Sequence, residues 1–409
     1  MTSDPTREAA FALLSAVLEQ RRTLEVALSA LPAMDARDRA AAHRLAAAVL
    51  RRTGTLDAVL EPLMRKAPPD PVRTVLRIGA AGLLLLDMPP HAAVGTAVTL
   101  ARNVGLTPFS GLVNAVLRKV ASGGKSVLET LDSPRLDTPA WLWASWGADA
   151  RAIAEAHQHE APLDLTLGPQ AVVPQGGVRL PSGTVRYPAG THVGDIPGFA
   201  AGRMWVQDAA AALPVMLLAP KPGERIADLC AAPGGKTAQL AAAGAIVTAV
   251  ERDPARMTRL ADNLARWGFQ AELVRTDVTT WSPPELFDAV LLDAPCSATG
   301  TIRRHPDVPH LKRPRDVVAS TEAQDGLLAA AGRLLRPGGR LIYAVCSLQP
   351  EEGAPRLAAS GLPAAPFQPE ELPCLPAAIT SAGWLRTHPG MWTILGGMDG
   401  FFAARLVRN

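Results

Sequence analysis

Aromatic residues, cysteines and long apolar runs are all scarce in this sequence. Aromatics make up 4% of the 409 residues, and cysteine occurs four times with no repeated or paired spacing. So few cysteines argue against a disulfide framework and are typical of proteins kept in a reducing cytosol. The strongest apolar run, residues 78–86, is too short to span a bilayer, and the first residues lack the pattern of a secretory signal. We therefore expect a soluble, cytoplasmic protein without a membrane partner.

Apolar residues, in contrast, are abundant at 48% and allow a sizeable core. The length suggests two or three domains. The net charge is only +3, but residues 1–125 contain 16 Lys and Arg against 10 Asp and Glu, so this part carries +6. A basic excess in one region fits contact with a polyanion, although a helical domain with solvated arginine-rich faces accounts for the charge equally well.

Residues 1–125 have the pattern of an all-α domain. Apolar residues recur at three- and four-residue spacing, which predicts helices at 9–18, 40–50, 72–86, 92–103 and 112–120. Two proline pairs, at 68–69 and 89–90, interrupt them as helix breakers. The glycine-containing stretch 121–125 is predicted to end the domain.

The rest of the chain divides into a small module and a larger α/β domain. Residues 138–205 are predicted to form an α+β module with a helix at 139–157 and strands at 163–167, 178–180 and 184–187. Residues 206–409 alternate between strand and helix patterns, as in a doubly wound sheet. Its strands are predicted at 225–229, 246–250, 271–274, 289–292 and 340–345, its helices at 255–267 and 326–335, and a closing hairpin at 392–395 and 401–406.

A loop rich in small residues follows the first of these strands and opens a helix. Such a loop lets the backbone approach a ligand, with the amides of the helix N-terminus facing it. Gly235, Lys236 and Thr237 resemble the end of a nucleotide-triphosphate loop, but that motif needs glycine at position 230, where this chain has Cys230. The loop therefore favours an adenosine-type cofactor bound at the carboxyl ends of the strands. Its residues are Cys230, Ala231, Ala232, Pro233, Gly234, Gly235 and Lys236.

Acidic residues follow the next two predicted strands. Glu251 comes directly after strand 246–250, where a carboxylate can bind ribose hydroxyls, and Asp253 is a less well placed substitute. Asp277 follows strand 271–274 and could accept a hydrogen bond from the adenine amino group. Solvated carboxylates are common at strand ends, but their order after successive strands favours ligand binding.

Two of the four cysteines also follow predicted strands. Cys296 lies in the sequence Asp293-Ala294-Pro295-Cys296-Ser297 after strand 289–292, and Cys346 follows strand 340–345. A thiolate that adds to carbon 6 of a cytosine makes carbon 5 nucleophilic enough to attack a sulfonium methyl group. By position alone, either thiol could be that nucleophile. Asp293 is placed to assist at ring N3. No His/Cys spacing suits a metal, so we expect none.

These motifs together resemble the RsmB/Nop/Sun family of RNA cytosine-5 methyltransferases. The resemblance covers the cofactor loop, Glu251, Asp277 and the proline–cysteine motif. Further family blocks are matched by His305-Pro306-Asp307 with Lys312-Arg313-Pro314, by Arg336-Pro337-Gly338-Gly339 and by Met398-Asp399-Gly400-Phe401-Phe402. The resemblance implies a Rossmann-like class I methyltransferase domain with a mixed seven-stranded sheet and S-adenosylmethionine as cofactor.

Membership of this family would also assign the two thiols. The nucleophile would be Cys346, in the later motif, and Cys296 would assist release of the methylated product. Asp293 would act in catalysis and also belong to the cofactor site. The family usually has threonine before the nucleophile and asparagine after the paired glutamates, where this chain has Val345 and Gly353.

The first 125 residues resemble the NusB-like RNA-binding domain found in RsmB-type members of this family, which methylate 16S ribosomal RNA. The resemblance therefore implies an RNA substrate, and we expect the protein to be a monomer. Basic residues flank the catalytic blocks and are candidates for phosphate contacts, with a merely solvated basic loop as the less favoured alternative. They are Arg303, Arg304, Lys312, Arg313 and Arg315.

Two other functions remain open at this point. The protein could methylate a cytosine of transfer RNA or of another ribosomal site, because catalytic motifs do not determine the substrate within a family. It could also be an RNA-binding factor that has kept the fold without the activity, although the intact acids and cysteines argue against that.

Overall fold

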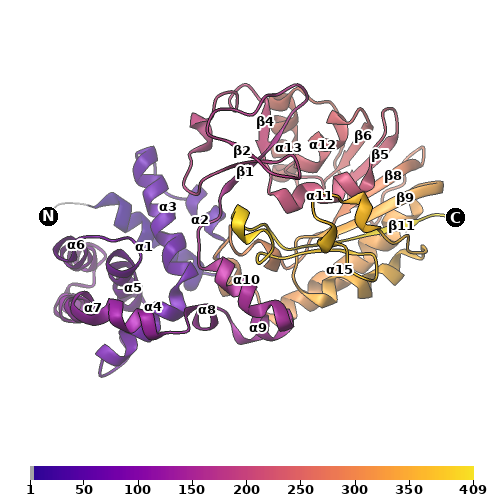
Figure 1. Ribbon diagram of the computed structural model, residues 1–409. Coiled ribbons are helices and arrows are strands. Elements are labelled where there is room, and N and C mark those ends of the chain that lie inside the picture. The colour runs from indigo at the N-terminus through magenta and orange to yellow at the C-terminus, as the bar shows by residue number, and fades with distance from the viewer. Residues whose placement is uncertain (1–3) are drawn as a thin grey trace. The chain divides into compact units, whose positions relative to one another are not determined.

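The computed structural model describes residues 4–409. Residues 1–3, part of the N-terminal stretch considered above for a secretory signal, lie outside the described part. The chain divides into two compact units (Figure 1). The helical unit extends to His159 and includes Ile302–Lys312, whereas the sheet unit consists of Glu160–Thr301 and Arg313–Asn409.

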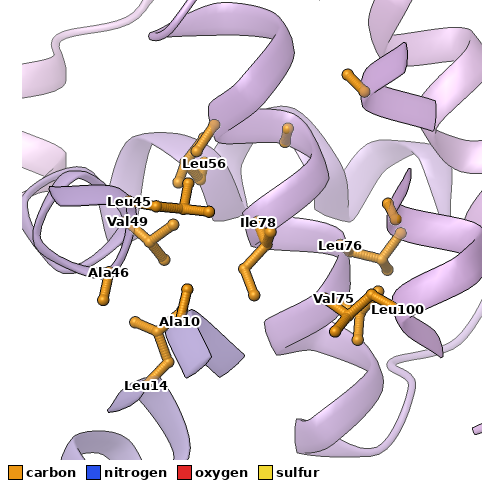
Figure 2. Packing of buried hydrophobic residues seen from close by; sticks show 14 of the residues in the cluster. Ala10, Leu14, Leu45, Ala46, Val49, Leu56, Val75, Leu76, Ile78 and Leu100 are labelled. Atoms are coloured by element: carbon orange, nitrogen blue, oxygen red, sulfur yellow. The ribbon is translucent and has the colours of Figure 1, made fainter. Parts of the chain in front are cut away.

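Helix α5 is the central element of the helical unit. It contacts α1, α3, α4, α6 and α7, and Figure 2 shows Val75, Leu76 and Ile78 of α5 among apolar side chains of its neighbours. A Cβ atom at Gly79 would lie 2.4 Å from Leu117 Cδ1, so glycine permits the close approach of α5 and α7. The helices are α1 (Pro5–Leu18), α2 (Leu24–Ser29), α3 (Ala36–Arg51), α4 (Thr53–Leu60), α5 (Asp70–Leu84), α6 (Pro90–Asn103), α7 (Ser110–Thr130), α8 (Ser133–Leu136), α9 (Ala140–Trp146), α10 (Ala150–His157) and α14 (Val308–Leu311).

The five predicted helices of this region are confirmed, but α7 continues beyond its predicted end. It runs through the stretch 121–125 that we expected to end the domain. Gly124 is buried within it, and a Cβ atom there would lie 2.9 Å from Val120 Cγ1 and 3.2 Å from Leu84 Cδ2. The glycine therefore allows close helix packing here rather than ending the helix.

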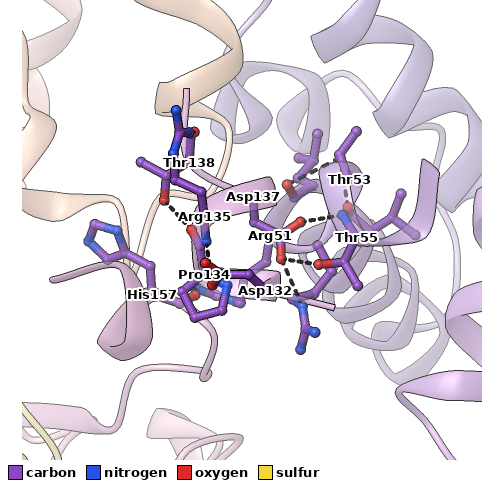
Figure 3. A network of polar contacts seen from close by, with 12 residues as sticks. Arg51, Thr53, Thr55, Asp132, Pro134, Arg135, Asp137, Thr138 and His157 are labelled. Carbon is purple, nitrogen blue, oxygen red and sulfur yellow. Dashed lines mark hydrogen bonds and ion pairs between the residues drawn. The ribbon is translucent and has the colours of Figure 1, made fainter. Parts of the chain in front are cut away.

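The segment after α7 is held to α3 and α4 by a buried aspartate (Figure 3). Asp137 accepts hydrogen bonds from the backbone nitrogen and the hydroxyl of Thr55, both at 2.7 Å, and from Arg52 Nε at 3.0 Å. Burial raises the pKa of Asp137, although the Thr55 and Arg52 contacts oppose that effect. These hydrogen bonds connect the segment that contains helices α8, α9 and α10 to the rest of the helical unit. The helices of the predicted 138–205 module thus lie in the helical unit and its strands in the sheet unit.

A small antiparallel sheet opens the sheet unit, with strand order β2-β3-β1-β4. Inside it, Arg186 forms a two-point ion pair with Asp164, at 2.6 and 2.7 Å, with both side chains buried. The same guanidinium donates to the carbonyls of Leu395 and Gly397, which joins this sheet to the C-terminal part of the chain. The strands are β1 (Leu163–Leu167), β2 (Val178–Arg179), β3 (Val185–Tyr187) and β4 (Met204–Val206).

The main sheet has seven strands in the order β10-β11-β9-β8-β5-β6-β7. Figure 1 labels β11, β9, β8, β5 and β6 of this sheet. The strands from β9 to β7 are parallel, whereas β11 runs antiparallel to β9 and β10 antiparallel to β11. This confirms the predicted mixed seven-stranded sheet. Its strands are β5 (Arg225–Leu229), β6 (Ile246–Val250), β7 (Glu272–Val274), β8 (Phe287–Asp293), β9 (Leu335–Val345), β10 (Leu385–Thr387) and β11 (Phe401–Val407).

Both faces of this sheet are covered. Ala289 and Leu291 of β8 pack in one hydrophobic cluster with α11 (Ala209–Leu218) and α12 (Gly235–Ala242). Their neighbours Val290 and Leu292 pack in a second cluster with α15 (Pro314–Arg333). Burial on both faces explains the nearly continuous apolar sequence of β8 and leaves the strand ends as the place for polar chemistry.

The predicted closing hairpin is wrong in one strand. Residues 393–395 form a short 3₁₀ helix, and the partner of β11 is β10. Trp392, Gly396 and Gly397 all have positive φ angles, which are incompatible with an extended strand. The apolar residues of this stretch had suggested a strand, but its glycines bend it into a turn.

No helix within residues 4–409 is long and apolar enough to cross a membrane.

Candidate functional site at the carboxyl edge of the sheet

The carboxyl ends of four parallel strands meet at one edge of the main sheet. Leu229, the last residue of β5, pairs with Val250 of β6 and with Leu292 of β8, and Val250 pairs with Val274 of β7. The cofactor loop, the acidic residues and the proline–cysteine motif all follow directly from these ends. The register therefore brings together segments that lie far apart in the sequence.

The cofactor loop between β5 and α12 is held in a defined path. Cys230 and Gly234 have φ angles of 60° and 106°, and the chain turns through them into α12. Helix α13 (Pro254–Trp267) binds the loop from the side, because Arg256 donates to the carbonyl of Ala232 and Asn263 to that of Pro233, at 2.7 and 2.9 Å. The backbone amides at the start of α12 are thereby left in a fixed orientation.

Three carboxylates lie within or after the strands β5, β6 and β7 at this edge. Glu251 is 3% exposed, and its side chain accepts from the backbone nitrogen of Asp253 and pairs with Arg256. Asp277 accepts from the nitrogen and hydroxyl of Thr279, which lowers the pKa of Asp277. Asp228 is fully buried inside β5, and burial raises the pKa of Asp228 to about 7 although it accepts from Thr237.

The two cysteines predicted at strand ends lie side by side. Cys296 follows β8 and Cys346 follows β9, and their Sγ atoms are 3.5 Å apart. The loops that carry them are close packed, because Gly300 donates to the carbonyl of Cys346 at 3.0 Å and Gly400 to that of Gly300 at 2.8 Å. A Cβ atom at Gly300 would lie only 2.0 Å from the Gly400 carbonyl oxygen. Gly400, which belongs to the block Met398–Phe402, thus helps to hold the two cysteine loops together.

The two thiols differ in their surroundings. The pKa of Cys296 is raised well above its ordinary value by its hydrogen bond with Cys346, by burial, and by the negative charge of Cys346 and Glu352. Cys296 is therefore a neutral thiol at neutral pH, and it can donate its hydrogen to the sulfur of Cys346.

An ion pair between the buried Lys236 and the half-buried Asp293 completes the site. Lys236 Nζ lies 2.7 Å from Asp293 Oδ2 and 5.2 Å from the centre of the Phe401 ring. Burial disfavours the charged lysine, but Asp293 outweighs that effect and, with Cys346 and Asp228, raises the pKa of Lys236. The site therefore keeps a protonated lysine in the electrostatic environment of Cys346.

Two regions of the chain match known protein families. Residues 215–407 match the family described as 16S rRNA methyltransferase RsmB/F, and residues 4–122 match the NusB family. Ribosomal RNA small subunit methyltransferase B of Sodalis glossinidius is 36% identical, and the alignment covers 96% of this chain and 95% of that protein. The protein of the same name from Salmonella typhi is 34% identical, with 96% of each chain covered. The chain belongs to the RsmB/F family.

Solved structures agree with this assignment at the level of the fold. The crystal structure of PH0851 matches over 99% of both chains with a TM-score of 0.74 and 23% identity. A methyltransferase homolog protein from Pyrococcus horikoshii, 25% identical, matches 70% of this chain and 98% of its own with a TM-score of 0.54. This RsmB/F-family protein is an S-adenosylmethionine-dependent RNA methyltransferase, as the motifs implied.

The residues of the carboxyl edge fit S-adenosylmethionine. The cofactor has hydroxyl and amino groups that donate hydrogen bonds, and the carboxylates after β6 and β7 are acceptors. Asp228 Oδ1, buried next to the loop, has no hydrogen-bond partner within residues 4–409. Cys230 differs from these carboxylates, because burial and the nearby Glu251 raise the pKa of its thiol to about 12. We therefore regard the Cys230 thiol as a small neutral side chain.

The predicted RNA-contacting residues of this RsmB/F-family protein differ in exposure. Arg304, Arg313 and Arg315 are exposed and Lys312 is half-buried. Arg303 is only 2% exposed, and its carbonyl accepts from Arg51 at 2.9 Å in the helical unit. A buried guanidinium does not face a phosphate in solution, so Arg303 is withdrawn from the candidate RNA contacts.

Sequence reasoning gave no role to a buried polar cluster behind the two cysteines. Its members are Ser297, Gln324, Ser347 and Glu352. The signal available in the sequence is a serine directly after each cysteine, but serine is common in loops. Only the fold shows that both serines meet one glutamate.

Proposed function

We propose that this RsmB/F-family protein methylates carbon 5 of a cytosine in 16S ribosomal RNA through a covalent bond between Cys346 Sγ and carbon 6. The observation that carries the proposal is the pair of thiols 3.5 Å apart at the ends of β8 and β9, next to the Lys236–Asp293 ion pair. Covalent catalysis needs one attacking thiolate, and a second thiol within reach can assist its departure.

The cofactor is assigned to the loop and acids at the carboxyl edge. Glu251 would hold the ribose hydroxyls and Asp277 the adenine amino group, while the loop from Cys230 to Lys236 would face the rest of the cofactor. When bound, S-adenosylmethionine supplies an electrophilic methyl group. Asp293 lies at the border of this site, since it is the last residue of β8 and its carboxylate binds Lys236.

Bond formation by Cys346 is the first step on the protein side. Its thiolate adds to carbon 6, and the electrons of the carbon 5–carbon 6 double bond move toward the carbon 5 and N3 side of the ring. Lys236 stabilises the thiolate before the attack. N3 takes a proton from solvent as the electrons arrive, the Asp293 carboxylate accepts a hydrogen bond from that N3–H, and the proton returns to solvent when the ring regains its double bonds. Carbon 5 then becomes the nucleophile toward the methyl group.

Release requires that Cys346 departs again. The carbon 5 proton passes to solvent, its bonding electrons restore the carbon 5–carbon 6 double bond, and Cys346 Sγ leaves with the electron pair of the carbon–sulfur bond. Cys296, a neutral thiol 3.5 Å away, donates its hydrogen to that departing sulfur. This assigns the two cysteines opposite tasks in one turnover.

The RNA partner is proposed from the relatives and from charge. The named relatives act on small-subunit ribosomal RNA, and residues 4–122 match the NusB family. Arg304, Lys312, Arg313 and Arg315 would contact phosphates. A cytosine can enter this edge only when it is unpaired or flipped out of a helix. We further propose that the protein acts in the cytoplasm as a monomer.

The test uses a strain that lacks this protein and is complemented with variants. Wild type should restore one bisulfite-resistant cytosine in 16S ribosomal RNA, and Cys346→Ala should restore none although the purified variant still binds S-adenosylmethionine. Cys374→Ala, which changes a half-buried thiol away from the strand ends, is the matched control and should behave as wild type. A mark restored by Cys346→Ala would contradict the mechanism, and a mark in transfer RNA would contradict the substrate.

A further inference from the structure

One buried carboxylate joins the two cysteine loops. Glu352 has no exposed surface, and it accepts from the backbone nitrogen of Ser297 at 2.8 Å and from the hydroxyl of the same serine. It also accepts from the hydroxyl of Ser347. Ser297 directly follows Cys296 and Ser347 directly follows Cys346, so a single side chain holds both loops next to their thiols.

The position of Glu352 is itself held by the surrounding fold. Gln324 of α15 donates to its carboxylate at 3.1 Å, and the hydroxyl of Tyr343 in β9 donates to its backbone carbonyl at 2.7 Å. The two serine hydroxyls also contact each other at 3.0 Å. The carboxylate therefore connects α15, the end of β9 and the loop after β8 through four hydrogen bonds.

This arrangement is a costly way to pack a protein interior. Within residues 4–409, Glu352 forms no ion pair, so its charge is compensated only by hydrogen-bond donors. A well-packed apolar residue is often at least as stable as a buried charge. A carboxylate with four donors offers something that an apolar side chain cannot, because each hydrogen bond constrains the direction of one loop.

We propose that Glu352 is a positioning residue that sets the spacing of the two thiols. Its hydrogen bonds to Ser297 and Ser347 keep Cys296 within reach of Cys346. The Cys296 thiol can then donate its hydrogen to the departing sulfur of Cys346. The consequence for turnover rests on the function proposed above, whereas the spacing itself does not.

The spacing can be measured without RNA. Diamide, an azo oxidant, takes the two thiol hydrogens and two electrons, becomes a hydrazine and leaves a disulfide. A disulfide requires a sulfur–sulfur distance of about 2.05 Å, so thiols held at 3.5 Å need only a small movement. The readout is the rate of Cys296–Cys346 disulfide formation, followed by peptide mass mapping in the full-length protein.

Two substitutions at Glu352 separate hydrogen bonding from charge. Glu352→Ala removes all the tethers and should slow disulfide formation by about tenfold or more, as expected when reacting groups are no longer held in place. Glu352→Gln should remain close to wild type, because its oxygen can face Ser297 N and Gln324 while its amide nitrogen donates to the serine hydroxyls. Glu322→Ala, an exposed glutamate on α15, is the matched control and should not change the rate.

The results that would overturn the proposal are specific. An alanine variant that oxidises as fast as wild type, or a glutamine variant as slow as alanine, would contradict it. If Glu352→Ala does not fold, as judged by loss of S-adenosylmethionine binding, Ser297→Ala and Ser347→Ala replace it. Each removes one tether and should slow the reaction, and unchanged rates in both would equally contradict the proposal.

Turnover gives a second readout that keeps the two proposals apart. Glu352→Ala should lower kcat with little change in KM for RNA, and glutamine should recover most of kcat. If wild type methylates no cytosine while the disulfide rate still depends on Glu352, the proposed function fails and the positioning assignment stands. If wild type is active but Glu352→Ala leaves both kcat and the disulfide rate unchanged, the proposed function stands and the positioning assignment fails.

Discussion

Asp228 shows how one buried residue at the cofactor edge responds to pH. Burial raises its pKa from 3.8 to about 7, against the hydrogen bond from Thr237. In the unfolded chain the carboxyl loses its proton near its ordinary value, but in the folded protein it keeps the proton up to about neutral pH. The folded state thus binds more protons between these values, and its stability falls as pH rises through that window.

The variant Asp228→Asn should remove this dependence. Without cofactor, wild type should lose up to about 4 kcal/mol of stability relative to the variant between pH 4 and pH 7, because one pKa unit corresponds to about 1.36 kcal/mol. Denaturant unfolding of both proteins at a series of pH values is the measurement. Curves that remain parallel across that range would show that Asp228 does not titrate there.

At the residue scale, the sequence indicates the candidate reacting groups more readily than the groups that hold them in place. Cys296, Cys346, Glu251 and Asp277 stand directly after apolar strands, and parallel strands bring such positions to one edge. The role of Glu352 could not be predicted in this way, because its partner Ser297 is 55 positions distant. Hydrogen bonds between distant loops follow from the packed fold and not from spacing.

At the scale of elements, helix α7 contains two adjacent glycines with different surroundings. A Cβ atom at Gly123 would meet nothing within 4 Å, whereas one at Gly124 would press on Val120 and Leu84. Sequence alone treats the pair as a helix breaker. In the structure, only Gly124 is required by packing.

Alanine substitutions should distinguish the two glycines. Gly123→Ala should stabilise α7 by about 0.5–1 kcal/mol, because alanine loses less backbone freedom than glycine on forming a helix. Gly124→Ala should gain less or destabilise the helix, since the new methyl group lies 2.9 Å from Val120 Cγ1. Hydrogen exchange of the α7 amides measures both effects, and equal gains would contradict the packing at Gly124.

The strands of the main sheet were the most predictable elements, and β5 and β6 begin and end as predicted. Strong apolar runs between turn residues explain that success. The stretch around Trp392 was misjudged because its apolar residues resemble a strand, while its backbone turns through three positive φ angles at Trp392, Gly396 and Gly397. Helix α15 begins at Pro314, twelve residues before its predicted start, because its polar first half lacks a clear apolar stripe.

At the scale of the whole molecule, the chain combines a helical unit with a sheet unit that carries the candidate site at its carboxyl edge. Both fold classes could be read from periodicity. The division between units could not, because Ile302–Lys312 interrupts the sheet unit in sequence and packs with the helical unit. There Asp307 accepts from the backbone nitrogen of Leu24 at 2.9 Å, a contact between residues 283 positions apart.

RNA binding by the whole molecule should depend on salt through its exposed arginines. Replacing Arg313 and Arg315 together by glutamine should weaken RNA binding and reduce the slope of log Kd against log salt concentration by about 1–2. With fewer phosphate contacts, fewer counterions are released from the RNA when the protein binds. Lys221→Gln is the control, because Lys221 is exposed near the amino end of β5, opposite the carboxyl edge of the main sheet. Filter binding across a salt series measures the slopes, and an unchanged slope in the double variant would remove these arginines from the interface.

The central claim is that Cys346 forms the covalent bond to RNA and Cys296 helps to break it. The most direct measurement incubates Cys296→Ala with S-adenosylmethionine and 16S ribosomal RNA, separates the products under denaturing conditions and maps the nucleotide-bearing peptide by mass spectrometry. We predict a slowly migrating adduct linked at Cys346, which disappears when Cys346 is also replaced by alanine. No adduct, or an adduct linked at another residue, would contradict the account.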